Sequence, residues 1–289
     1  MTLSELLVSA CIAILVAGAA LAAITPLQRS FAAQPEAASL SQRTRVVAEL
    51  LIGDLQRASL VLPLRFGAVD NDIARGVFHR DDVVTTFIDP AAALASGAVT
   101  PSASRTYHLK QDAEGIWQLM QYDGLASDQP AVEDVIALRF EYFGSGEPPS
   151  ASVTQRGDVR ATYGAAPPLP AVDDPGDTWG PGENCTIATA GGQYVPRLPN
   201  LGAGVVPIGQ AVLEDGPWCP DAAHAFRFDA DLLRIRRVRV QVQLQAARPF
   251  RGFPGAWFAN GGAAGDPWRY VPDERVTLEV MPRNVHVAR

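Results

Sequence analysis

The start of the chain lacks charge, and the whole chain is nearly without lysine. No charged residue lies between Leu6 and Ile24, Lys110 is the only lysine, and the first basic residue is Arg29. The full chain of 289 residues has a formal net charge of −7. Because binding to a phosphate backbone requires clustered positive charge, this balance argues against a nucleic-acid partner.

Sequence motifs for catalysis are also missing. The four histidines form no HExxH or His-x-His pattern, no GxSxG motif offers a serine nucleophile, and no glycine-rich phosphate loop follows an expected strand. We therefore expect a protein that is not an enzyme and that uses no cofactor.

Cysteine is scarce, with three residues in the whole chain. Cys11 lies in the apolar run, whereas Cys185 and Cys219 lie in a stretch rich in proline and glycine, without a CxxC motif or neighbouring histidines. This arrangement predicts a Cys185–Cys219 disulfide rather than a metal site. A disulfide favours a periplasmic or extracellular domain.

A short acidic segment is the other candidate for a metal site. Asp173, Asp174, Asp177 and Glu183 follow one another closely among glycines. Oxygen ligands in such a loop are typical of calcium sites, but the spacing does not fit the EF-hand pattern. We interpret the segment as a solvated acidic loop and predict no metal; Asp173, Asp174 and Asp177 are the calcium ligands of the alternative interpretation.

The apolar run predicts a membrane-spanning helix over residues 1–25. At about 1.5 Å per residue, a helix from Leu6 to Ile24 just crosses a hydrocarbon core of about 30 Å. Glu5 stands at its start, where a carboxylate needs a counter-charge. Because the basic residues all follow the run, the positive-inside rule would place the bulk of this chain in the cytoplasm. We therefore expect a basic leader before Met1; a cleaved signal peptide is the alternative.

Residues 26–62 are expected to continue the helix as an amphipathic half that ends before Pro63. Its apolar positions mostly recur every four residues: Leu40, Val47, Leu51, Leu55, Ala58 and Leu62. Such a stripe requires a partner surface, which the remaining chain would supply as a sheet.

The sequence pattern of residues 63–289 predicts a β-rich globular domain. Segments rich in β-branched and aromatic residues predict strands at 77–79, 82–88, 105–110, 116–122, 132–143, 238–244 and 275–281. The third and fourth form a hairpin across residues 111–115. Arg234, Arg236, Arg237 and Arg239 are expected on a solvated strand face or edge. Residues 144–224 lack periodicity and are interpreted as an irregular insertion. The predicted fold class is α+β, a long helix on an antiparallel sheet.

The N-terminal segment MTLSELLVSACIAILVAG resembles that of the type IV pilin superfamily, which includes the pseudopilins of type II secretion. The match runs from Met1 to Gly18, with Ser4 in place of the usual apolar residue. The resemblance implies that prepilin peptidase exposes Met1, that its amine is N-methylated, and that Glu5 pairs with the Met1 amine of a neighbouring subunit.

Two looser similarities favour J-type minor pseudopilins or PilW-type minor pilins. The segment Asp54–Ala58 (DLQRA) is similar to the DLRRA segment of that group, as are Phe140-Glu141-Tyr142 and Pro282-Arg283-Asn284. The resemblance implies a structural subunit that primes or caps a pilus or pseudopilus. It would sit in the bacterial inner membrane with its C-terminal domain in the periplasm, and its partners would be other pilins, prepilin peptidase and membrane lipid. The alternative is a single-span membrane-anchored or secreted β-rich binding domain.

Overall fold

The computed structural model describes residues 3–58, 60–62, 84–87, 104–123, 127–148, 151–153, 159–161, 183, 185–219, 228–247, 271 and 273–282. For some of these, including residues 5, 6 and 22–33, it describes the backbone but not the side chain. Several predictions fall outside these residues: the strand at 77–79 and the acidic residues Asp173, Asp174 and Asp177.

The chain divides into two compact units. The first comprises residues 1–44 and 244–274, and the second comprises residues 45–243 and 275–289. In the first unit, the helix and the later segment are held together by polar contacts. Glu36 accepts from Arg43 at 2.6 Å and from the Ala247 amide at 2.8 Å, and Ser41 donates to Glu274 at 3.4 Å.

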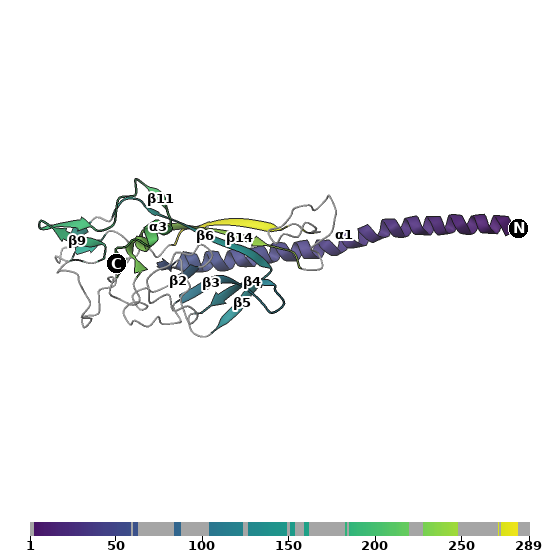
Figure 1. Cartoon of the computed structure of the whole chain (residues 1–289), viewed down its shortest axis with the longest axis horizontal. Helices are drawn as coiled ribbons and strands as arrows, with labels where there is room; N and C mark the ends of the chain where they lie inside the picture. The colour runs from purple at the N-terminus through teal and green to yellow at the C-terminus, as the bar shows by residue number, and fades with distance from the viewer. Residues whose placement is uncertain are drawn as a thin grey trace. The chain divides into compact units, whose positions relative to one another are not determined.

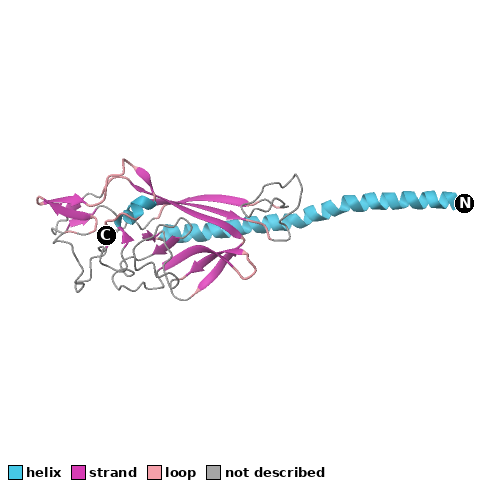
Figure 2. Cartoon of the chain, in the orientation of Figure 1, coloured by secondary structure: helices cyan, strands magenta, loops and turns pink. Residues whose placement is uncertain are grey.

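Helix α1 (Leu3–Arg57) is continuous over 55 residues and is drawn in cyan in Figure 2. In the second unit, the predicted stripe is confirmed, because Val47, Leu51 and Leu55 are completely buried. The predicted end at residue 62 is wrong. The helix ends at Arg57, and β1 (Leu60–Leu62) pairs with β2 (Val84–Phe87). The apolar triplet of β1 fits both periodicities, so only its pairing with a distant strand decides the outcome.

A five-stranded sheet has the order β1-β2-β3-β4-β5, with every neighbouring pair antiparallel. Figure 1 labels β2 to β5 of this sheet. Its remaining strands are β3 (Ser104–Gln111), β4 (Trp117–Tyr122) and β5 (Asp128–Glu133). The predicted β3–β4 hairpin is confirmed, with its loop shifted by one residue to 112–116. Asp112 organises this loop by accepting from the amides of Glu114 and Ile116 at 3.0 and 2.7 Å.

A four-stranded sheet has the order β11-β6-β14-β15. Its strands are β11 (Val205–Ile208), β6 (Val135–Ser145), β14 (Ile235–Leu244) and β15 (Glu274–Val280). The single strand predicted at 132–143 is in fact two, because Asp134 has φ 60° and breaks the run between β5 and β6. Aspartate tolerates this left-handed conformation, which carries the chain from one sheet into the other.

The core lies where these elements meet. Strand β6 lies against β3 and β4, and Phe140 and Tyr142 on it are almost completely buried. The alternation predicted for β14 is confirmed for its apolar side, since Val238 and Val240 are buried. The alternation of valines with arginine and glutamine along residues 238–244 also predicts that the polar side lies in water. This is wrong for Gln243, which is buried and accepts from Arg275 at 2.9 Å.

The stretch predicted as irregular, residues 144–224, contains regular structure in its described parts. Three two-stranded ribbons form. They pair β7 (Ala151–Val153) with β8 (Val159–Ala161), β9 (Ile187–Ala190) with β10 (Gln193–Pro196), and β12 (Trp218–Cys219) with the later β13 (Phe228–Asp229). The short helix α3 (Gln210–Leu213) precedes β12, and the 3₁₀ helix η3 (Ala230–Arg234) follows β13. Each of these elements spans two to five residues, too few for a periodicity to be recognised.

The predicted α+β class is therefore confirmed in its general form, a long helix together with antiparallel sheets. Within the part of the chain that the structure describes, no helix combines the length and the apolar character needed to cross a membrane.

Candidate functional site

The residues singled out by the N-terminal motif are described only in part. Met1 lies outside the described residues, and Glu5 belongs to helix α1, with its backbone described and its side chain not. The described side chains that follow, residues 7–21, are all exposed. The large apolar ones among them are between 56% and 72% exposed: Leu7, Val8, Ile12, Ile14, Leu15, Val16 and Leu21. This helix segment is a large apolar surface that nothing in the described chain covers.

Cys11 is free and Cys185 is disulfide-bonded, as the sequence suggests, but the partner of Cys185 is not described. Cys11 is a free, exposed thiol. Cys185 is buried and disulfide-bonded, and the side chain of Cys219 lies outside the described part. The Cys185–Cys219 disulfide therefore stays a prediction.

The DLQRA segment, at the C-terminal end of α1, contacts the five-stranded sheet through Asp54. Tyr107 on β3 donates to Asp54 at 2.5 Å, Arg57 also pairs with Asp54, and Gln121 donates to the Tyr107 hydroxyl at 3.1 Å. Burial, and then the hydrogen bond to the Asp54 carboxylate, raise the pKa of Tyr107 well above its usual value. The tyrosine thus stays a donor, and in this chain the segment has a structural role.

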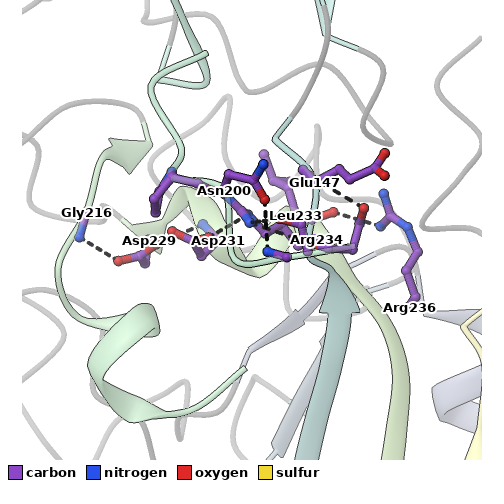
Figure 3. A network of polar contacts seen from close by, with 12 residues as sticks. Glu147, Asn200, Gly216, Asp229, Asp231, Leu233, Arg234 and Arg236 are labelled. Atoms are coloured by element: carbon purple, nitrogen blue, oxygen red, sulfur yellow. Dashed lines mark hydrogen bonds and ion pairs between the residues drawn. The ribbon is translucent and has the colours of Figure 1, made fainter. Parts of the chain in front are cut away.

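A cluster of mostly buried polar residues lies where β13 and η3 meet the turn after α3 (Figure 3). One carboxylate oxygen each from Asp215, Asp229 and Asp231 lies within 4.8 Å of the other two. Asp229 and Asp231 are completely buried, whereas Asp215 is exposed. Among the three acids, Asp215 is therefore the one that solvent reaches in the described part of the chain.

Local backbone geometry places the three acids together. Asp229 precedes η3 and accepts from the amides of Asp231 at 2.8 Å and Gly216 at 2.7 Å, as Figure 3 shows for the latter. Gly216 has φ 80°, a conformation that glycine adopts without strain, and it directly follows Asp215. The turn is therefore tied to η3 through the Asp229 carboxylate.

Arg234 is the cation that contacts this cluster. Its Nε lies 2.6 Å from Asp231 Oδ1, and both side chains are completely buried. The guanidinium also donates to the carbonyl oxygens of Ser145 and Gly146, at 3.4 and 3.3 Å, and to that of Pro199. Its donors are thus shared between one carboxylate and the backbone of β6 and neighbouring loops. The expectation that the arginine run lies on a solvated strand is therefore wrong for Arg234, which is completely buried and belongs to η3.

The electrostatics of the cluster are unbalanced, since three carboxylates face one guanidinium. Burial raises the pKa of Asp231, with further increases from Asp229 and Asp215, although Arg234 opposes the shift. Burial likewise raises the pKa of Asp229, although the amides of Asp231 and Gly216 oppose it. A buried site with excess negative charge takes up a proton or a cation.

The sequence gives a weak indication of this cluster in the spacing of Asp229, Asp231 and Arg234. Asp231 and Arg234 are three residues apart, as in an ion pair on one helical turn, and Asp229 is placed to cap that turn. Asp215 is distant in the sequence, and the β12–β13 pairing together with the turn at Gly216 brings it close.

Comparison with known proteins gives little. No known protein-family pattern matches the chain. No curated protein matches it. Among solved structures, the chain is similar to a type IV-like pilin from Thermus thermophilus, with 11% sequence identity, a TM-score of 0.31, and coverage of 86% of this chain and 98% of that chain. A TM-score this low carries no argument about the function of this chain.

Proposed function

We propose that this protein is a minor pilin or minor pseudopilin, a structural subunit that helps to prime or cap a type IV pilus or a type II secretion pseudopilus. The observation that carries the proposal is the exposed apolar segment of α1, which begins directly after Glu5. Burying its large side chains would be worth on the order of 10 kcal/mol, at about 1.5–3 kcal/mol each. A helix with this surface needs lipid or other helices around it.

The proposal assigns two successive environments to this helix. In the first, residues 1–25 anchor the subunit in the bacterial inner membrane, with the following domain in the periplasm. In the second, after prepilin peptidase has exposed Met1 and the amine has been N-methylated, the same surface packs against the helices of other pilins or pseudopilins. Exposed apolar side chains on all sides of residues 7–21 suit both environments.

Glu5 has a specific role in this proposal. A carboxylate in an apolar helix bundle is costly unless it is paired, and the Met1 amine of an adjacent subunit is a suitable partner. Because only one axial register brings the two charges together, the pair would align the subunits. The proposed protein is not an enzyme, and its chemistry is that of assembly.

Substitution of Glu5 tests this role. We expect Glu5→Ala to leave membrane insertion unchanged and to abolish or strongly reduce incorporation into sheared filaments or pseudopili, measured by immunoblotting. Glu49→Ala is the matched control, since it removes an acid from the same helix that is exposed and pairs with Arg45. Equal incorporation of Glu5→Ala, Glu49→Ala and the wild type would contradict the charge-pairing mechanism.

A further inference from the structure

We propose that Asp215, Asp229 and Asp231 form a calcium site that ties the turn after α3 to η3. The proposal does not depend on the function proposed above. It starts from geometry, because three carboxylates from two separate segments converge within 4.8 Å. Two oxygens bound to one Ca²⁺ at about 2.3–2.6 Å can be at most about 5 Å apart, so this spacing fits a shared ion.

An independent feature of Asp231 points to a ligand. Its side chain is completely buried, and its Oδ2 has no hydrogen-bond donor among the described residues. The other oxygen faces Arg234. A buried carboxylate oxygen without a donor is costly, and a cation among the three acids would satisfy it.

The neighbouring cation does not fill this need. Arg234 lies 2.6 Å from Asp231 Oδ1, and its remaining contacts are backbone carbonyl groups. One guanidinium against three carboxylates leaves a net charge of −2 when all the groups are ionised, and two of these acids are completely buried. A divalent cation would balance this charge.

The chemistry of the donors selects the kind of ion. All three side chains offer hard carboxylate oxygens and none offers nitrogen or sulfur, which favours Ca²⁺ or Mg²⁺ over zinc or copper. Ca²⁺ accepts irregular coordination completed by water, whereas Mg²⁺ requires near-octahedral ligands at about 2.0–2.1 Å. Asp215 is exposed, so water could complete the coordination on its side. Calcium is therefore the ion proposed.

The expected consequence is local order. Asp215 is two residues before Pro217, whose carbonyl accepts from the Ala230 amide at 2.8 Å, and β12 follows directly. An ion shared by Asp215 and Asp231 would add to this connection and to the hydrogen bond from the Gly216 amide to Asp229. It would stabilise the β12–β13 ribbon against η3, and through Arg234 the end of β6.

The test uses the full chain purified in detergent, stripped with EDTA, with CaCl₂ and MgCl₂ as the probes. We expect CaCl₂ at about 1 mM, the weak end of known extracellular calcium modules, to raise the midpoint of thermal unfolding, and MgCl₂ to do so much less. Calorimetric titration should give one calcium per chain at this site.

Two variants decide whether the ion binds at this cluster. Asp215→Asn removes an exposed ligand without opening the buried pair, so it should fold in EDTA and bind calcium at least tenfold more weakly. Glu214→Gln is the matched control and should bind as the wild type does, because Glu214 contacts Gln210 instead. No calcium effect on the wild type, or an equal effect on wild type and Asp215→Asn, would overturn the proposal.

Discussion

Single residues fix how the elements of the second unit join. Tyr107 is completely buried on β3 and donates to Asp54 near the end of α1, so one hydroxyl connects the helix to the sheet. Arg234 has a similar role at the other sheet, where its guanidinium donates to the carbonyl oxygens of Ser145, the last residue of β6, and of Gly146. Both side chains are polar and serve packing, and each donates to at least one group that lies far away in the sequence.

Tyr107→Phe tests the first of these connections. The substitution removes the donor to Asp54 while keeping the ring, and Arg57 still pairs with that carboxylate. We expect the free energy of unfolding to fall by about 1–3 kcal/mol, the usual range for a hydrogen bond to a charged group. Denaturant unfolding of the full chain measures this, with the exposed Tyr194→Phe as the control that should have no effect. A Tyr107→Phe protein as stable as the wild type would contradict the role of the hydroxyl.

At the scale of elements, β6 approaches η3 very closely. A Cβ built on Gly144 would lie 2.6 Å from the Arg234 carbonyl oxygen, a distance that no side chain tolerates. Nothing lies within 4 Å of a Cβ built on Gly53 in α1. Close approach therefore requires glycine at position 144, whereas nothing around position 53 excludes a side chain and helix propensity disfavours glycine there.

Gly144→Ala and Gly53→Ala give a matched pair of predictions. The first should lower the free energy of unfolding by about 1–3 kcal/mol, as overpacking of a core does, because the opposing atom is backbone. The second should raise it by up to about 1 kcal/mol, since alanine favours a helix more than glycine does. Thermal unfolding of the two variants beside the wild type measures the sign. Equal effects of the same sign would contradict the close approach of β6 and η3.

The buried stripe of α1 makes a prediction of its own. Leu51 is completely buried, whereas Val46 on the same helix is 45% exposed. Truncating a buried leucine typically costs about 2–5 kcal/mol, so Leu51→Ala should strongly lower the unfolding midpoint. Val46→Ala should change it little. If the two variants lost similar stability in denaturant unfolding, the stripe would not be the surface that contacts the rest of the second unit.

The elements with a clear period were the predictable part of the fold. The stripe through Leu51, the β3–β4 hairpin and the alternating Val238 and Val240 all follow from spacing alone, because burial selects one face of a helix or strand. The end of α1 was not predictable, since the triplet Leu60–Leu62 fits a helix as well as a strand. The break at Asp134 was also missed, because one residue in the left-handed conformation leaves the apolar alternation around it intact.

The acidic cluster could not be predicted for a different reason. Asp229 precedes η3 and Asp231 lies in its first turn, so local sequence could suggest both. Asp215 joins them through strand pairing and the turn at Gly216. Arg234 was misjudged because a run of arginines is usually solvated, whereas a buried acid three residues earlier reverses that expectation. Long-range placement of charge does not appear in local patterns.

At the scale of the whole molecule, the two units differ in what they bury. The second unit contains both larger sheets and most of the buried core, whereas the first contains an apolar helix segment whose described side chains are exposed. The central claim of the account concerns that segment. It is the proposal that Met1 begins the mature subunit and that the helix after Glu5 serves in assembly.

The most direct test is mass spectrometry of the N-terminus of the protein purified from its native host. The account predicts a mature chain that begins at Met1 with an N-methylated amine and retains the whole apolar helix. A single-span anchor of another class would leave the Met1 amine unmethylated. A secreted domain would instead begin near residue 23, after signal-peptide cleavage. Either result would contradict the proposed assembly role.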